Sequence, residues 1–235
     1  FVDFSEKSNP EKAYRVWCQK QARTIFSLTA EVLCSFSIFK ISSNDTGFYI
    51  RLHHLVSDGW SVQLITNQIA EAYEKRTESA MNVCSFPSYL AVVEAEEKEI
   101  FSKRLMQHKT FWNEMTQHLE DLPERETSYS LKATRMTFQL DKSMSGKIKE
   151  FTLRHSISLN TFIIGIYILY VLKTTKKKYV TLGLPLLGRS SRTERETCGT
   201  FTNTMPFYFE ATRDVDVLTM FSDLSQRLWE CCVHQ

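Results

Sequence analysis

Residues 53–61 of this chain read His-His-Leu-Val-Ser-Asp-Gly-Trp-Ser, and the interpretation of the whole sequence starts from them. An apolar segment ending at Leu52 precedes this stretch, and apolar residues at helical spacing follow it. Histidine, whose ordinary pKa is roughly 6.5, can take or give a proton near neutral pH. An acid at fixed spacing, here Asp58, can order the loop, and we expect Gly59 to let the backbone turn before the helix. This layout predicts acid-base chemistry of the kind used in acyl transfer.

Alternation along the preceding strand distinguishes the two histidines. The even-numbered residues from Phe48 to Leu52 share one face with His54, and His53 belongs to the other face. We therefore expect His54 to continue a buried apolar row. From alternation alone, a packed core histidine remains an alternative to a catalytic one, and ordinary turn chemistry remains an alternative for Asp58 with the glycine after it.

The sequence does not predict a metal site. Adjacent strand residues such as His53 and His54 point to opposite faces and cannot easily share one ion, and no third ligand follows at zinc-like spacing. The cysteines also lack metal-binding spacing, and we expect them to be reduced thiols in a cytoplasmic protein. They are Cys18, Cys34, Cys84, Cys198, Cys231 and Cys232.

Residues 53–59 match the pattern HHxxxDG, and with the following Trp-Ser the chain resembles the condensation domains of nonribosomal peptide synthetases, relatives of chloramphenicol acetyltransferase. Further segments agree with this family in order and spacing. Residues 182–189 and 198–206 resemble its Gly-x-Pro-x-x-Gly-Arg loop and the Gly-x-x-x-Asn-Thr-x-Pro strand that follows. The segment from residue 86 to Phe111-Trp112 resembles its intervening helical region, and residues 22–36 resemble the strand before the signature.

The resemblance implies an α/β fold, of the two-layer α+β kind, built from two chloramphenicol acetyltransferase-like lobes in a V-shaped arrangement. Residues 1–122 would be the later part of the N-terminal lobe and residues 131–235 the first part of the C-terminal lobe, so each lobe is expected to be only partly present. Both chain ends look internal. Residues 123–130, which begin with a proline and are mainly polar, are the best candidate for a linker.

The resemblance also implies roles for single residues. His54 would be the catalytic residue, and His53 a packing or hydrogen-bonding neighbour. Asp58 would be structural and would pair with Arg189 through a bidentate guanidinium fork, tying a loop of one lobe to a loop of the other. Gly59 would support the same loop.

The implied reaction joins two carrier-bound substrates. An upstream carrier protein presents a donor acyl or peptidyl thioester and a downstream one an aminoacyl thioester, both on 4'-phosphopantetheine arms, and the amine attacks the donor carbonyl beside His54. We expect no cofactor bound by the domain itself, and adjacent adenylation domains as further partners. A free α-amine has a pKa of about 8, so its deprotonation before attack is not the main obstacle. His54 would either accept the proton of the tetrahedral intermediate or orient the amine.

Composition limits the partners. The chain is 43 % hydrophobic and 24 % charged with a net charge of +2, so its positive electrostatic potential is too weak to indicate a nucleic-acid partner. Its most continuous apolar run, at residues 162–172, is shorter than the roughly 18 residues that a membrane span requires. We therefore expect neither nucleic acid nor membrane as a partner.

Periodicity and turn residues predict the elements that carry these motifs. The apolar face of the helix predicted at 61–75, with Val62 and Tyr73 among its residues, is expected to be core. The predicted helices are 11–22, 61–75, a long charged region at 89–119, one ending near 155, 160–173 and one from about 215, and the predicted strands are 1–4, 32–41, 47–54, 133–140, 179–184 and 202–209.

Three other functions stay open. One is a coenzyme A-dependent O- or N-acyltransferase of the same superfamily, although the chain lacks the Asp-Phe-Gly-Trp-Gly motif of the plant branch. Another is a specialised member that epimerises or cyclises, although those branches usually alter the signature. The third is a degenerate, non-catalytic partner-binding domain, which the intact signature disfavours.

Overall fold

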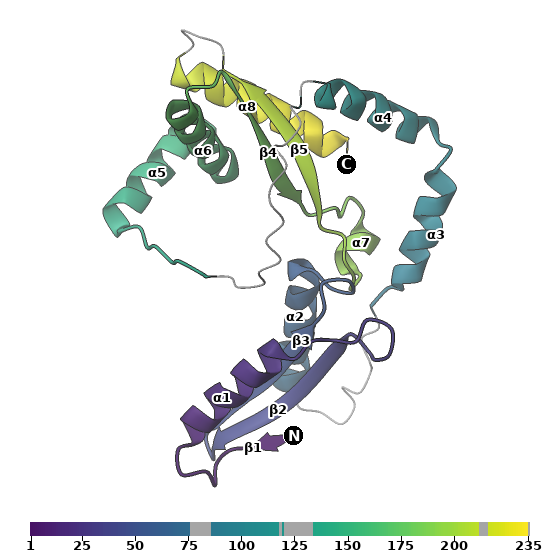
Figure 1. Cartoon of the computed structure of the whole chain (residues 1–235), viewed down its shortest axis with the longest axis vertical. Helices are drawn as coiled ribbons and strands as arrows, with labels where there is room; N and C mark the ends of the chain where they lie inside the picture. The colour runs from purple at the N-terminus through teal and green to yellow at the C-terminus, as the bar shows by residue number, and fades with distance from the viewer. Residues whose placement is uncertain (76–85, 118, 120–133, 212–215, 235) are drawn as a thin grey trace. The chain divides into compact units, whose positions relative to one another are not determined.

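The computed structural model describes residues 1–75, 86–117, 119, 134–211 and 216–234. Contacts divide the chain into two compact units, which we call the first unit (Phe1–Glu97 with Leu187–Thr202) and the second unit (Lys98–Leu186 with Asn203–Gln235). The elements labelled in Figure 1 are β1 (Val2–Asp3), α1 (Pro10–Arg23), β2 (Cys34–Ser42), β3 (Asp45–Leu52), α2 (Gly59–Lys75), α3 (Tyr89–Glu99), α4 (Lys103–Thr116), α5 (Lys142–Arg154), α6 (Leu159–Thr175), β4 (Tyr179–Leu186), α7 (Arg192–Glu196), β5 (Asn203–Glu210) and α8 (Val217–Val233).

The linker predicted at residues 123–130 lies outside the described residues, so the division into lobes at that point stays a prediction. The two compact units divide the chain elsewhere. Residues 187–202, which the sequence assigns to the C-terminal lobe, belong by their contacts to the first unit.

A hairpin forms the sheet of the first unit. β2 and β3 pair antiparallel around a turn at Ser43 and Asn44, residues that favour turns, and β1 adds parallel to β2. The register places Phe36 opposite Ile50. As strand residues alternate in orientation, the register also fixes which side chains share a face.

Helix α1 covers one face of this hairpin (Figure 1). Asn9 caps it by accepting a hydrogen bond from the amide of Lys12 at 3.0 Å. Tyr14 then stacks on Phe39 with 4.4 Å between ring centroids, and Trp17 meets the ring of Tyr49 edge-on at 4.9 Å. The covered face is therefore the one that carries the odd-numbered residues of β3.

The buried apolar row predicted on the other face is wrong. Phe48 is 46 % exposed and its cross-strand neighbour Ile38 is 60 % exposed. His54 is exposed as well, because β3 ends at Leu52 and the alternation does not extend to it. The apolar face of α2 is also less buried than predicted, since Val62 and Tyr73 are exposed.

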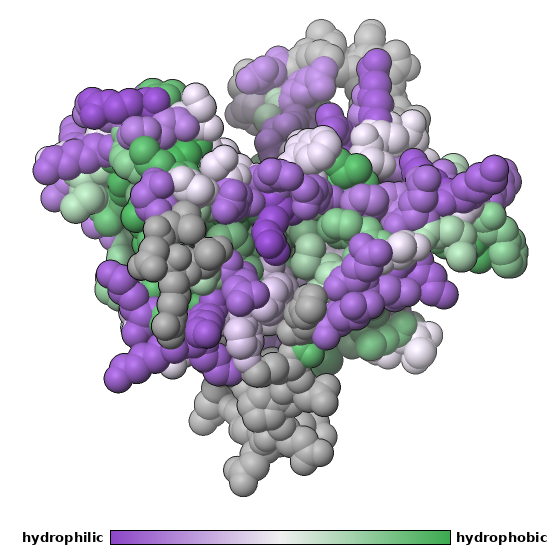
Figure 2. Space-filling model, turned by 90° about the horizontal axis from the view of Figure 1, so that it is seen from above, coloured by the Kyte–Doolittle hydropathy of each residue, from purple (hydrophilic) through white to green (hydrophobic). Residues whose placement is uncertain are grey.

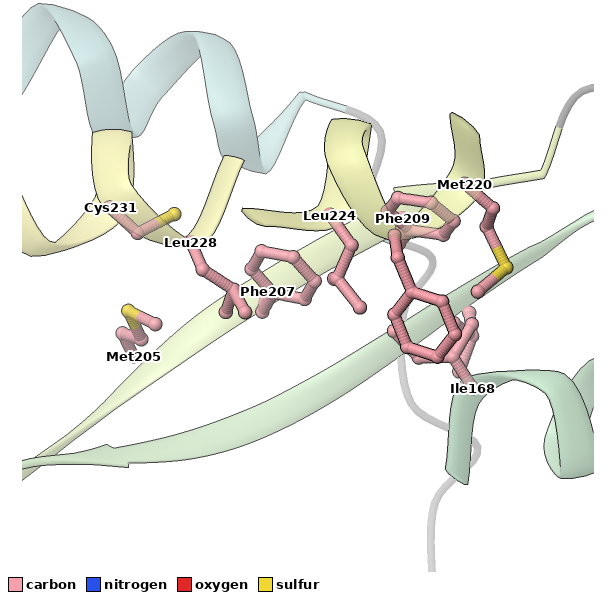
Figure 3. Packing of buried hydrophobic residues seen from close by; sticks show 10 residues of the cluster. Ile168, Met205, Phe207, Phe209, Met220, Leu224, Leu228 and Cys231 are labelled. Carbon is pink, nitrogen blue, oxygen red and sulfur yellow. The ribbon is translucent and has the colours of Figure 1, made fainter. Parts of the chain in front are cut away.

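The second unit has its core between the β4–β5 hairpin and helices α6 and α8. Phe207 and Phe209 project from β5 toward apolar residues that recur along one side of α8, and Ile168 of α6 completes the layer (Figure 3). The α8 residues are Met220, Phe221, Leu224, Leu228 and Cys231. The helices and strands predicted after residue 140 are present within a few residues of their predicted bounds.

Two predicted elements need correction, and one observed helix was not predicted. Residues 134–140 show the alternating pattern of a strand but form none, because a strand requires a hydrogen-bonded neighbour and this segment has none among the described residues; Met136 and Phe138 stay exposed. The long helix predicted at 89–119 is two helices, since Ser102 caps a new one by accepting from the amide of Leu105. The short helix α7 has no counterpart among the predicted elements.

Within the described residues, no single helix is long and apolar enough to span a membrane, and α5 and α6 meet that criterion only when joined across a bend of 106°. Figure 2 shows that apolar side chains reach the surface among hydrophilic ones on the face it presents. The described cysteines are all free thiols, and Cys84 lies outside the described residues.

Candidate active site

Asp58 sits at the start of α2 with its side chain fully buried in the first unit. One carboxylate oxygen accepts hydrogen bonds from the amide and the hydroxyl of Ser61 at 2.8 and 2.9 Å. The other accepts from the amide of Phe201 at 3.1 Å and lies 3.4 Å from the hydroxyl of Thr202. Asp58 therefore caps α2 and binds the 187–202 segment with the same group.

Arg189 is the cation that faces this carboxylate, so the pairing expected from the sequence is present. Its Nη2 lies 3.0 and 3.1 Å from the two oxygens of Asp58. The expected bidentate contact with the carboxylate is made by this one nitrogen, because Nη1 donates to the carbonyls of Glu194 and Thr197. The guanidinium also lies 4.0 Å from the ring centroid of Phe201.

The ion pair is charged at neutral pH. Burial by itself would raise the pKa of Asp58, but hydrogen bonds from the backbone of Ser61 and Phe201, the Ser61 hydroxyl and Arg189 lower it to about 2. Removing one member of a buried pair leaves an uncompensated charge, which is strongly destabilising. Asp58 and Arg189 thus form a fixed structural connection within the first unit.

Helix α7 and the residue that ends it, Thr197, present the carbonyls that accept hydrogen bonds from Nη1 of Arg189. Ser191 accepts a hydrogen bond from the amide of Glu194, and the carboxylate of Glu194 accepts from the amides of Ser190 and Ser191, which makes a capping box. Burial would raise the pKa of Glu194, but these hydrogen bonds lower it. The box fixes the short helix and with it the partners of Arg189.

Two glycines allow the 187–202 segment to reach the site. Gly188 has φ +65, and a Cβ there would collide with the carbonyl oxygen of Phe201. A Cβ on Gly199 would collide with the ring of Tyr89. Both positions therefore require glycine.

Gly59 is different. A Cβ at this position would meet no atom within 4 Å, its φ lies outside the left-handed region, and α2 begins at Gly59 itself. The backbone turn before α2 therefore does not require a glycine at this position, contrary to our expectation.

Ser61 and Trp60 join the start of α2 to the distant segment. The Ser61 hydroxyl accepts from the amide of Gly199 at 3.0 Å and lies 2.8 Å from the Gly199 carbonyl. Trp60 donates its indole N–H to the carbonyl of Arg195 at 2.7 Å. Ser61 is not among the predicted site residues, although its place three residues after the capping Asp58 is the position where capping partners occur.

His53 is held on the covered face of the sheet. Its amide donates to the carbonyl of Leu33 at 2.9 Å, and its Nδ1 accepts from the amide of Leu55 at 3.1 Å. The ring meets Phe26 edge-on with 5.9 Å between centroids. In the neutral ring the hydrogen is therefore on Nε2, and both its packing and its hydrogen bond are local.

His54 follows on the turn between β3 and α2 and is exposed. Its carbonyl accepts a hydrogen bond from the hydroxyl of Thr200 at 2.5 Å. Among the described residues, its imidazole has no hydrogen-bond partner. In that part of the chain there is also no group of three or more residues suited to hold a metal ion.

Comparison with known proteins identifies the family. The family described as Condensation domain matches residues 1–235. A plipastatin synthase subunit of Bacillus subtilis (strain 168) is 25 % identical over 240 residues, covering all of this chain but 9 % of that protein. Surfactin synthase subunit 1 of the same organism is 24 % identical over 210 residues, which is 87 % of this chain and 6 % of that protein.

Solved structures agree in fold. VibH, an NRPS condensation enzyme, superposes with a TM-score of 0.82 at 17 % identity, covering 99 % of this chain and 55 % of that one. The first condensation domain of the calcium-dependent antibiotic synthetase gives 0.79 at 19 % identity, with 99 % and 53 % covered. The chain thus spans about half the length of these structures, and the predicted α+β class is confirmed. The resemblance drawn from residues 53–61 is confirmed too: the chain belongs to the condensation domain family.

Proposed function

We propose that the protein containing this chain forms amide bonds in nonribosomal peptide synthesis. The amine of a carrier-bound aminoacyl thioester attacks the carbonyl of a carrier-bound acyl or peptidyl thioester; a C–N bond forms, the C–S bond breaks, and the donor arm leaves as a thiol. The observation that carries this proposal is the exposed His54 on a turn whose neighbouring residues are fixed, in a chain that matches the condensation family over residues 1–235.

His54 acts on the proton that the amine must lose. Attack by a neutral amine gives a tetrahedral intermediate with a positively charged nitrogen, and collapse to the amide requires a base. A free imidazole in water contact suits this role, and a positioned base contributes typically 10²–10⁴-fold. The same imidazole can also orient the amine before attack.

The other site residues hold His54 in place and do not contact the reacting atoms. Asp58 and Arg189 fix the start of α2 against the 187–202 segment through a fully buried pair. His53 packs on Phe26 and fixes the turn through its own Nδ1. Gly59 is not part of this support, since a Cβ at this position would meet no atom within 4 Å.

The substrates arrive on 4'-phosphopantetheine arms of an upstream donor carrier and a downstream acceptor carrier, with adenylation domains nearby. Support comes from the relatives, which are synthases and synthetases of which this chain covers only a small part. The two lobes of chloramphenicol acetyltransferase type, arranged in a V, belong to the same proposal.

The test uses the full-length polypeptide that contains this segment and a panel of acyl and aminoacyl thioesters loaded on carrier proteins. Mass spectrometry should find the amide on the acceptor carrier. His54→Ala should lower its rate of formation by 10²-fold or more, on the order of a lost general base, at unchanged melting temperature, whereas His155→Ala, a histidine of the second unit, should leave the rate unchanged. If product forms only from coenzyme A thioesters, the protein is the coenzyme A-dependent acyltransferase. Turnover unaffected by His54→Ala would refute the role of this residue.

A further inference from the structure

We propose that Thr200 is a positioning residue for His54. The inference rests on the proposed function and adds to it a residue that acts through the backbone of the catalytic histidine. The hydroxyl of Thr200 donates to the carbonyl of His54 at 2.5 Å, although 146 positions separate the two in sequence.

The need for such a residue follows from the way His54 is held. Its imidazole has no hydrogen-bond partner among the described residues, so its location depends on its own backbone. The amide of His53 is held by Leu33, and the amides of Leu55 and Val56 bond to His53. The carbonyl of His54 is a further polar group of this turn, and Thr200 is its partner.

Thr200 is itself rigidly placed, which a positioning residue must be. On one side, the amide of Gly199 donates to the hydroxyl of Ser61, and the carbonyl of Gly199 lies close to the same hydroxyl. On the other side, the amide of Phe201 donates to the buried carboxylate of Asp58.

The carbonyl of Thr200 provides a third anchor. It accepts from the hydroxyl of Tyr89 at 3.0 Å, and the Tyr89 ring meets Phe201 edge-on at 5.3 Å and lies directly against Gly199. The Thr200 hydroxyl therefore connects the residues held by the buried Asp58–Arg189 pair to the peptide unit that carries His54.

Loss of this hydroxyl should affect catalysis more than folding. The hydrogen bond is at an exposed place, so water can satisfy the His54 carbonyl when the hydroxyl is removed. Water does not fix the peptide unit, however, and a base must be held within about 0.5 Å of its productive position. A displacement of about 1 Å can cost 10²-fold in rate.

The experiment compares Thr200→Val, which keeps the shape but removes the donor, with Thr200→Ser, which keeps the donor. The matched control is Thr66→Val, which removes a threonine hydroxyl that bonds the carbonyl of Val62 within α2. In the full-length polypeptide, with the carrier-bound pair that gives most amide, Thr200→Val should lower kcat about tenfold or more at unchanged KM and melting temperature. Thr200→Ser should retain most of the rate, and Thr66→Val all of it.

A double variant shows whether the effect passes through His54. If Thr200 acts by placing this imidazole, Thr200→Val should have no further effect on the residual rate of His54→Ala. A wild-type rate in Thr200→Val, an equal loss in Thr200→Ser, or full additivity with His54→Ala would each overturn the inference and leave the proposed function standing. Absence of amide from every carrier-bound pair with the unaltered protein would overturn both.

Discussion

Asp58 shows how a single buried residue can join two segments that lie far apart in sequence, next to the turn that carries His54. Its carboxylate is fully buried, yet its pKa is lowered to about 2 because hydrogen-bond donors from both α2 and the 187–202 segment converge on it. A charge buried in this way is tolerated only with its partners in place. Asp58 therefore stabilises the fold only while α2 and the 187–202 segment keep their arrangement beside His54.

The first prediction concerns the pH dependence of stability. The folded-state pKa of Asp58, about 2, lies below the value of roughly 3.9 in an unfolded chain, so its contribution is present above pH 4 and is lost as the pH falls through 2. This contribution amounts to about 2–3 kcal/mol. The difference in unfolding free energy between the wild type and Asp58→Asn, measured by urea titration at several pH values, should shrink from pH 5 to pH 2. A difference that stays constant over this range would contradict the lowered pKa.

The second prediction concerns coupling between Asp58 and Arg189. Each single change, Asp58→Asn or Arg189→Ala, should lower the unfolding free energy by roughly 3–5 kcal/mol, as expected for a buried pair. The melting temperature and the activity should fall together. Arg189→Ala should cost more, because it also frees the carbonyls of Glu194 and Thr197. The double variant should be less impaired than the sum of the singles. Strict additivity, or lost activity at unchanged stability in Asp58→Asn, would instead place Asp58 in the chemistry.

At the scale of elements, local signals predict most of the structure. Helical spacing and turn residues locate α1, α2, α5, α6 and α8, and apolar runs between turns locate β2 to β5. The failures have specific causes. Alternation cannot tell which face of a strand a helix will cover, so the burial predicted for the even-numbered face of β3 is wrong, and residues 134–140 have the strand pattern without a strand beside them among the described residues.

The third prediction separates two glycines of the signature motifs. Gly59→Ala should leave the unfolding free energy unchanged or raise it by about 0.4–1 kcal/mol, because alanine fits a helical first turn and restricts the unfolded chain. Gly188→Ala should destabilise, since its φ of +65 and the nearby carbonyl of Phe201 leave no room for a Cβ. Thermal unfolding of the two variants provides the comparison. A larger loss for Gly59→Ala than for Gly188→Ala would refute this assignment.

The fourth prediction tests the helix that fills the second unit's core. Leu224 of α8 is fully buried, and Leu224→Ala should cost about 2–5 kcal/mol through lost burial and the cavity it leaves. Leu218→Ala on the same helix is the matched control, because Leu218 is 41 % exposed and should cost much less. Similar losses for the two variants in urea titration would mean that the core is packed differently.

At the scale of the whole molecule, the site could not be assembled from local pattern. Asp58 and Arg189 are 131 positions apart, and neither periodicity nor composition relates them. Only the resemblance of two separate motifs to one family linked them, and it linked them correctly as a pair but not in hydrogen-bond geometry. The contacts of Ser61 and Thr200 with the opposite segment depend on the backbone conformation at Gly188 and on the close packing of Gly199 against Tyr89, which local pattern does not specify.

The fifth prediction concerns the form in which substrates arrive. If the substrates arrive on carrier proteins as proposed, the donor acyl group is used far better on a carrier protein than on coenzyme A, because binding energy from the remote carrier surface contributes to positioning at His54. For one acyl group, kcat/KM of the full-length polypeptide should therefore be at least tenfold higher with the carrier-bound thioester. Both donors present the same pantetheine thioester, so the comparison isolates the carrier protein. Equal kcat/KM for the two donors would mean that the protein recognises the pantetheine arm alone. A higher kcat/KM with coenzyme A would indicate an acyltransferase that uses this thioester directly.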